Sequence, residues 1–109
     1  MKKADQYTFR VSWSEEDQEY VATCTEFPGL SWLDASPETA ISGIRKVVGQ
    51  CIRDMERADE PIPEPYSARI YSGKFMVRVP PQLHRELAIQ AAESGVSLNR
   101  LVAHKLSAQ

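Results

Sequence analysis

The sequence predicts an α+β chain of 109 residues that is built from two small modules. Strand-like alternation fills the first third of the chain, and one long amphipathic helix follows it. A proline-rich segment then separates these elements from a short basic end. Residues 1–66 carry 7 Lys/Arg and 13 Asp/Glu, a formal charge of −6, whereas residues 67–109 carry 6 and 2, a formal charge of +4. This division indicates two modules with different partners, unless it is a chance asymmetry of solvated surfaces.

The first module begins with three predicted strands. Residues 7–13 alternate apolar and polar side chains, which is typical of a half-buried strand. A polar loop follows, and residues 20–25, rich in Tyr, Val and Thr, form the second strand. The turn at Pro28 and Gly29 leads into a short apolar third strand at residues 30–33.

A long helix is predicted from Ser36 to about Arg57. Ser36 is a favoured N-cap, and Pro37 suits the first helical position because its missing N–H costs no hydrogen bond there. Apolar residues then follow the spacing of one helical face, at positions 40, 41, 44, 47, 48, 51, 52 and 55. We expect this stripe to cover the sheet and to complete a β-β-β-α module.

The proline-rich segment at 61–65 cannot continue a helix and favours an extended chain. We therefore place the boundary between the modules after residue 66. The stretch Tyr66–Tyr71 could add a strand to the first sheet, or it could belong to the connection.

The second module is predicted to contain one strand and two helices. Residues 74–79 alternate, and the Pro80-Pro81 pair ends this strand and starts a helix. Gly95 supplies the left-handed geometry that ends this helix, and Ser97 can cap the next one. A unit of this size cannot bury a core alone, and a lone strand leaves its backbone groups unpaired. The sequence therefore predicts a homodimer through this end, with dimer against tetramer left open.

Residues 73–107 resemble a ribbon-helix-helix repressor, in the strand, the leucine-rich helix, the Ser-Gly turn and the Ser-Leu-Asn start of the last helix. The resemblance implies that strands from two chains form a ribbon in the major groove of operator DNA. Carried over by position, Lys74, Met76 and Arg78 would meet base edges, and Ser97 and Asn99 would hold a phosphate. The alternatives are a solvated strand face and, for Ser97, a helix cap alone.

The whole chain resembles the HicB antitoxin family. The resemblance rests on the order of both modules and on Glu26-Phe27-Pro28-Gly29-Leu30 followed by Ser36-Pro37-Glu38-Thr39-Ala40. It implies a partially degenerate ribonuclease-H-like domain that binds a small RNA-cleaving HicA toxin, and a complex that represses its own operon. An acidic surface would attract such a basic toxin. We therefore expect the antitoxin of a type II toxin–antitoxin system.

We expect no catalytic residues, no metal and no cofactor. A two-metal site needs converging carboxylates, and the first predicted strand contains none. The polar loop holds Glu15, Glu16, Asp17 and Glu19, and only Glu26 and Asp34 flank the third strand. His84 and His104 are predicted helix-surface residues, far in sequence from Cys24 and Cys51.

Neither a signal sequence nor a membrane span is predicted, so we expect a cytoplasmic protein. The alternatives are a stand-alone repressor whose first module binds a ligand or protein, and a nuclease with an unrecognised site.

Overall fold

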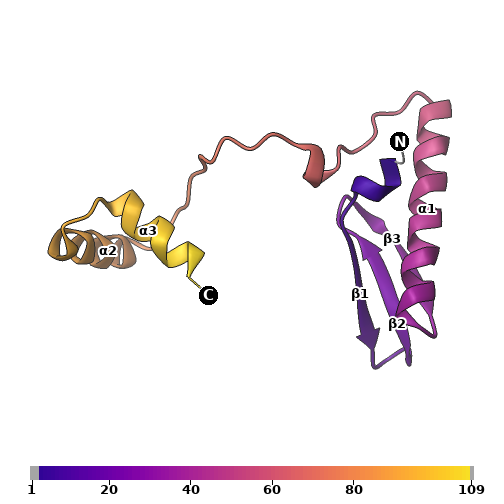
Figure 1. The fold of residues 1–109 in the computed structure, drawn as a ribbon, viewed down its shortest axis with the longest axis horizontal. Helices are drawn as coiled ribbons and strands as arrows, with labels where there is room; N and C mark the ends of the chain where they lie inside the picture. Colours follow the sequence, from indigo (N-terminus) through magenta and orange to yellow (C-terminus); the bar gives the residue numbers. More distant parts are fainter. Residues whose placement is uncertain (1–2, 109) are drawn as a thin grey trace. The chain divides into compact units, whose positions relative to one another are not determined.

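The computed structural model describes residues 3–108 and divides them into two compact units, one ending at Tyr71 and one beginning at Ser72 (Figure 1). None of the helices within the described range is long and apolar enough to cross a bilayer. The first unit contains η1 (Lys3–Gln6), β1 (Phe9–Ser14), β2 (Glu19–Cys24), β3 (Phe27–Asp34), α1 (Pro37–Arg57) and η2 (Tyr66–Ala68), and the second contains α2 (Pro81–Ser94) and α3 (Leu98–Ser107).

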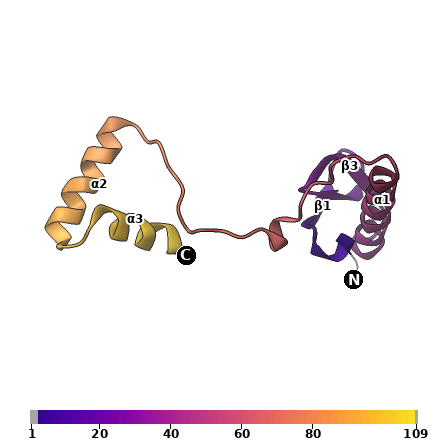
Figure 2. The same cartoon turned by 90° about the horizontal axis from the view of Figure 1, so that it is seen from above.

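The predicted α+β fold is confirmed in the first unit, where three antiparallel strands are followed by a helix. The sheet order is β1-β2-β3, and α1 lies across one of its faces (Figures 1 and 2). The central ladder aligns Val11 with Ala22 and Ala22 with Trp32. The third strand is longer than predicted, because it begins at Phe27 and takes up the Pro28-Gly29 turn in a register shift opposite Cys24.

The core of the first unit lies between α1 and the sheet. The apolar stripe of α1 provides the buried residues Ala40, Ile44, Val48 and Ile52, as its spacing predicts. Ser36 caps the helix, since its side chain accepts a hydrogen bond from the Thr39 N–H at 3.2 Å. Burial of these side chains holds α1 against the strands although the helix contains two glycines.

Gly43 has a packing role that its low helix propensity does not reveal. A Cβ atom at this position would overlap the indole ring of Trp32 and would force that ring to move. Trp32 therefore lies directly on the helix backbone at Gly43. The close packing of Trp32 on the helix offsets the roughly 1 kcal/mol that glycine costs a helix relative to alanine.

The segment after α1 folds back onto the first unit. Tyr7 donates a hydrogen bond from its hydroxyl to the Pro63 carbonyl, and Ser67 donates from Oγ to the Gln6 carbonyl at 2.6 Å. Residues 66–68 form the short 3-10 helix η2, so the strand considered for Tyr66–Tyr71 is wrong. These contacts tie the connection to η1 and β1, and the first unit consequently extends to Tyr71 rather than ending at the predicted residue 66.

The second unit consists of α2 and α3 with little buried between them. Gly95 ends α2 with φ of 70°, the left-handed C-cap that the sequence predicts. Of the residues described from Ser72 onward, only Ala91 and Leu101 are buried. Residues 74–79 pair with no other strand in the described chain and are drawn as a thread in Figure 1. The predicted strand is therefore absent from the single chain, because a strand requires a partner to form a ladder.

Candidate functional site

The residues predicted to meet base edges lie together in the segment before α2. Lys74, Met76 and Arg78 are all exposed. The segment starts at a turn, in which Gly73 has φ of 86° and the Lys74 N–H donates to Ser72 Oγ at 3.0 Å. Three charged or long side chains are therefore presented at alternate positions on an open stretch of backbone.

The opposite side of the same segment is apolar and equally open. Phe75, Val77 and Val79 are 77%, 60% and 38% exposed. Soluble chains rarely leave a run of large apolar side chains in water without a partner. In the part of the chain that the structure describes, these three apolar side chains are left exposed.

The two residues predicted to hold a phosphate lie at the start of α3. Ser97 is its N-cap, and its Oγ accepts from the Arg100 N–H at 3.0 Å. Asn99 is exposed in the first turn. The 14 residues of α2 lie between this site and the segment at 74–79, a separation of about 20 Å along the helix. One chain therefore carries the two predicted contact sets at opposite ends of α2 (Figure 2).

Arg100 is an exposed basic residue in the first turn of α3, and the predicted set of DNA-contacting residues does not include it. It stands next to Asn99, where the N-terminal end of the helix already favours an anion. The positive charge of Arg100 beside Asn99, rather than a motif, is the feature of the sequence that points to it.

Glu26 is the buried charged residue of the first unit, with 7% of its surface exposed. Its carboxylate accepts from the Thr8 N–H at 3.0 Å, from the Thr8 hydroxyl at 3.1 Å and from the Tyr66 N–H at 2.9 Å. Burial raises the pKa of Glu26, but the hydrogen bonds from Tyr66 and Thr8 outweigh it and leave the pKa below that of a free glutamate. Glu26, in the β2–β3 connection, thus joins the residue before β1 to the first residue of η2.

Asp34 lies at the other end of β3. It accepts from the Ala35 N–H at 2.8 Å and from the Trp32 indole N–H at 3.3 Å. The hydrogen bond from Ala35 is the main cause of its lowered pKa, with smaller contributions from the side chains of Thr39 and Trp32. Because Asp34 and Glu26 stand at opposite ends of one strand, they do not converge on a common ligand.

The remaining candidate catalytic groups are also dispersed. Glu15 and Asp17 hydrogen-bond within the β1–β2 turn, to Trp13 and Ser14. No group of three or more His, Cys, Asp or Glu within residues 3–108 is placed to hold a metal ion. The exposed histidines, the buried Cys24 and the half-buried Cys51 lie on separate elements, and burial is the main reason that the pKa of the Cys24 thiol is raised.

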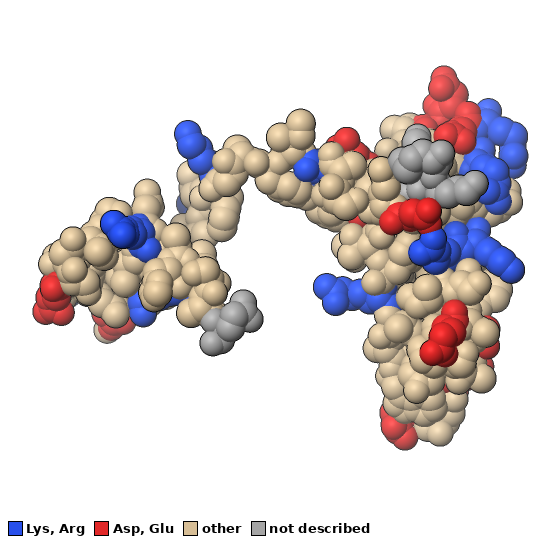
Figure 3. Space-filling model, in the orientation of Figure 1, with Lys and Arg blue, Asp and Glu red and all other residues tan. Residues whose placement is uncertain are grey.

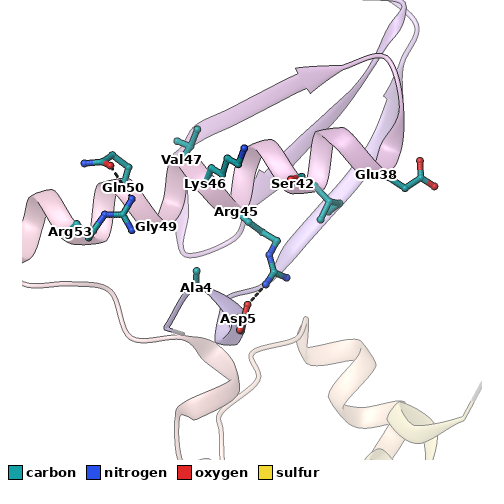
Figure 4. Close-up of a pocket in the computed structure, with 11 residues that line it drawn as sticks. Ala4, Asp5, Glu38, Ser42, Arg45, Lys46, Val47, Gly49, Gln50 and Arg53 are labelled. Atoms are coloured by element: carbon teal, nitrogen blue, oxygen red, sulfur yellow. Dashed lines mark hydrogen bonds and ion pairs between the residues drawn. The ribbon is translucent and has the colours of Figure 1, made fainter. Parts of the chain in front are cut away.

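An open groove of about 990 Å³ lies along the outer face of α1 (Figure 4). Arg45, Lys46 and Arg53 line it, and Arg45 pairs with Asp5. The first unit is therefore not acidic throughout, as its net charge alone had suggested. Three of its positive charges lie on one side of α1.

Comparison with known proteins gives one match. The HicB family matches residues 55–106, from the end of α1 through the connection to α3. This match indicates similarity to the HicB family, whose members are typically antitoxins rather than enzymes and have a toxin partner of the HicA kind. The matched stretch is slightly less than half of the chain and does not include the sheet. No curated protein and no solved structure matches the chain.

Replacing Glu26 with glutamine should lower the free energy of unfolding of the first unit by about 1–3 kcal/mol at pH 7. The introduced side chain would keep one acceptor oxygen, but its amide nitrogen would face a donor, either the Thr8 or the Tyr66 N–H. Urea unfolding followed by tryptophan fluorescence measures the change, because both tryptophans lie in this unit. Glu64→Gln, an exposed residue of the same connection, is the control.

The loss of stability caused by Glu26→Gln should depend on pH. The pKa of Glu26 is lower in the folded than in the unfolded chain, so its stabilising contribution is full above the unfolded pKa and is lost as the pH falls through the folded pKa. The difference between wild type and Glu26→Gln should therefore shrink in acid. A difference that stays constant from neutral to acid pH would contradict this role.

Proposed function

We propose that this protein is the antitoxin of a HicAB-like type II system, which binds an RNA-cleaving HicA-like toxin and represses its own operon. The first unit, of a partially degenerate ribonuclease-H-like kind, would bind the toxin. The second unit would form a ribbon-helix-helix homodimer on operator DNA. The observation that carries the DNA half of the proposal is the open segment at 74–79, whose two faces differ in chemistry.

A second copy of the chain would give this segment both backbone hydrogen-bond partners and cover for its apolar face. Antiparallel pairing of two such segments would satisfy their backbone N–H and C=O groups. It would also place Phe75, Val77 and Val79 of both chains against the helices, where only Ala91 and Leu101 are now buried. Dimerisation is therefore expected to supply the core that the second unit lacks on its own.

Pairing would leave the other face of the ribbon for DNA. Arg78 can donate two hydrogen bonds to guanine, and Lys74 can reach the same acceptors. Met76 would offer apolar contact to a thymine methyl group. Ser97 and Asn99, with the helix N–H groups beside them, suit the flanking phosphates.

The family match supports the toxin half of the proposal. The first unit has its own packed core and carries no residue assigned to DNA. A toxin that binds RNA should carry positive charge, and the excess of acidic residues in residues 1–66 favours its approach.

The full chain should sediment at low micromolar concentration as a species of twice 12.3 kDa. Val77→Asp should dissociate it, because a carboxylate would be buried in the proposed dimer core. Met76→Asp is the matched control, since the neighbouring side chain would point away from that core. A well-folded wild-type monomer would exclude the ribbon arrangement.

Arg78→Ala should weaken binding to the protein's own promoter by about 1–3 kcal/mol for each lost bidentate contact, and twice over in a dimer. It should also relax sequence preference, whereas Asn99→Ala should weaken binding to all sequences more evenly. Gel-shift titrations measure both effects, with Arg53→Ala on α1 as the control for loss of one positive charge. Unchanged affinity of Arg78→Ala would mean that the other strand face meets DNA.

A fragment of residues 1–71 should capture the candidate toxin and should not bind promoter DNA. The structure favours this end point over residue 66, because η2 and Ser67 contact the first unit. Pull-down of a candidate HicA-like toxin by each fragment is the measurement. Capture by residues 72–109 and not by residues 1–71 would reverse the assignment of roles. Promoter binding by the full chain without any toxin capture would favour a stand-alone repressor.

A further inference from the structure

Three aromatic side chains gather at the end of the sheet where β1 turns into β2. Trp13 lies opposite Tyr20, and Tyr20 lies opposite Asp34 on β3. Trp32 is two residues before Asp34 and so occupies the same face. Although this face is the one that α1 covers, Trp13 and Trp32 remain 47% and 40% exposed. The chain contains no other tryptophan.

Each indole is held in place by the structure around it. Trp13 packs edge-on against Tyr20, with ring centroids 5.1 Å apart, and its N–H donates to Glu15 at 3.0 Å. Trp32 lies on the backbone of Gly43, and its N–H donates to Asp34. Large aromatic groups that are fixed and half exposed lose little conformational entropy on binding, and such residues dominate protein interfaces.

Carboxylates lie next to both indoles, because Glu15 accepts the N–H of Trp13 and Asp34 accepts the N–H of Trp32. Between Val11 and Ile44 the chain carries seven Asp and Glu residues and no Lys or Arg. Of these carboxylates, Glu26 is buried, whereas Glu15, Glu16 and Asp17 are exposed in the β1–β2 turn. Figure 3 shows the result, because the lower part of the first unit is tan and red, and the blue side chains lie above it.

We propose that the turn-end patch, formed by Trp13, Tyr20, Trp32, Glu15, Glu16 and Asp34, is the docking surface for the basic toxin. This inference rests on the proposed function and adds the contact residues to it. Arginine and lysine side chains of the partner can stack on the exposed indole faces while they pair with the surrounding carboxylates. The aromatic rings would supply the central contacts, and the turn carboxylates would steer the approach.

The groove on α1 is a poorer candidate for the same partner. Arg45, Lys46 and Arg53 line it together with Asp5 and Glu38, so the groove offers a basic protein no excess of carboxylates. The exposed carboxylates of the β1–β2 turn therefore favour the aromatic end of the unit over the groove.

The test is titration of the full chain with a purified candidate HicA-like toxin, made as an inactive variant. Trp13→Ala should weaken binding at least tenfold, as expected for an interface hot spot, and Tyr71→Ala, an exposed aromatic residue outside the patch, should leave it unchanged. Glu16→Lys should weaken binding several-fold at low salt and less at high salt. Glu60→Lys, the same charge change at an exposed position after α1, is its control.

These variants separate the patch from the function on which it rests. Binding by wild type that neither Trp13→Ala nor Glu16→Lys weakens would overturn the patch and leave toxin binding intact. Equal losses in Glu16→Lys and Glu60→Lys would also overturn it, since net charge alone would then explain the effect. Failure of wild type to bind would overturn the proposed function and the patch together. If Trp13→Ala does not fold, Glu16→Lys decides alone, because Glu16 is exposed in a turn.

Discussion

The carboxylate of Glu26 determines where the first unit ends. It accepts hydrogen bonds from Thr8, which immediately precedes β1, and from Tyr66, which follows the proline-rich segment. A buried charge is tolerated only when it is fully hydrogen-bonded, so these segments must stay together for the unit to remain folded. The connection is consequently part of the first unit through Tyr71 and is not a free linker.

The second unit, in contrast, lacks a core of its own, since its short helices bury almost nothing by themselves. Its alternating segment has no strand partner within residues 3–108. A chain in this condition gains most from a second copy, which supplies backbone partners and apolar cover in one step. The proposed DNA surface would exist only after that pairing, and dimerisation and DNA recognition would then be one event.

The distribution of charge connects the two proposed activities. Net charge divides the chain at the level of sequence, but folding divides the first unit again, into an acidic turn end and a basic side of α1. The basic toxin would favour the acidic turn end of the first unit, and operator DNA would favour the second unit, which carries more Lys and Arg than Asp and Glu. This separation would allow toxin and DNA to be held at the same time, which a complex that represses its own operon requires.

The sequence by itself determined the features that depend on neighbours along the chain. Alternation predicts the strands, 3.6-residue spacing predicts α1, and the caps at Ser36 and Gly95 follow from local backbone geometry. The same local patterns marked Lys74, Met76 and Arg78 as one exposed face. Only the tertiary structure decided the role of Glu26, the 3-10 form of residues 66–68, and the contact of Trp32 with Gly43. These features join residues up to 40 positions apart, and single long-range hydrogen bonds or close approaches leave no periodic pattern in a sequence.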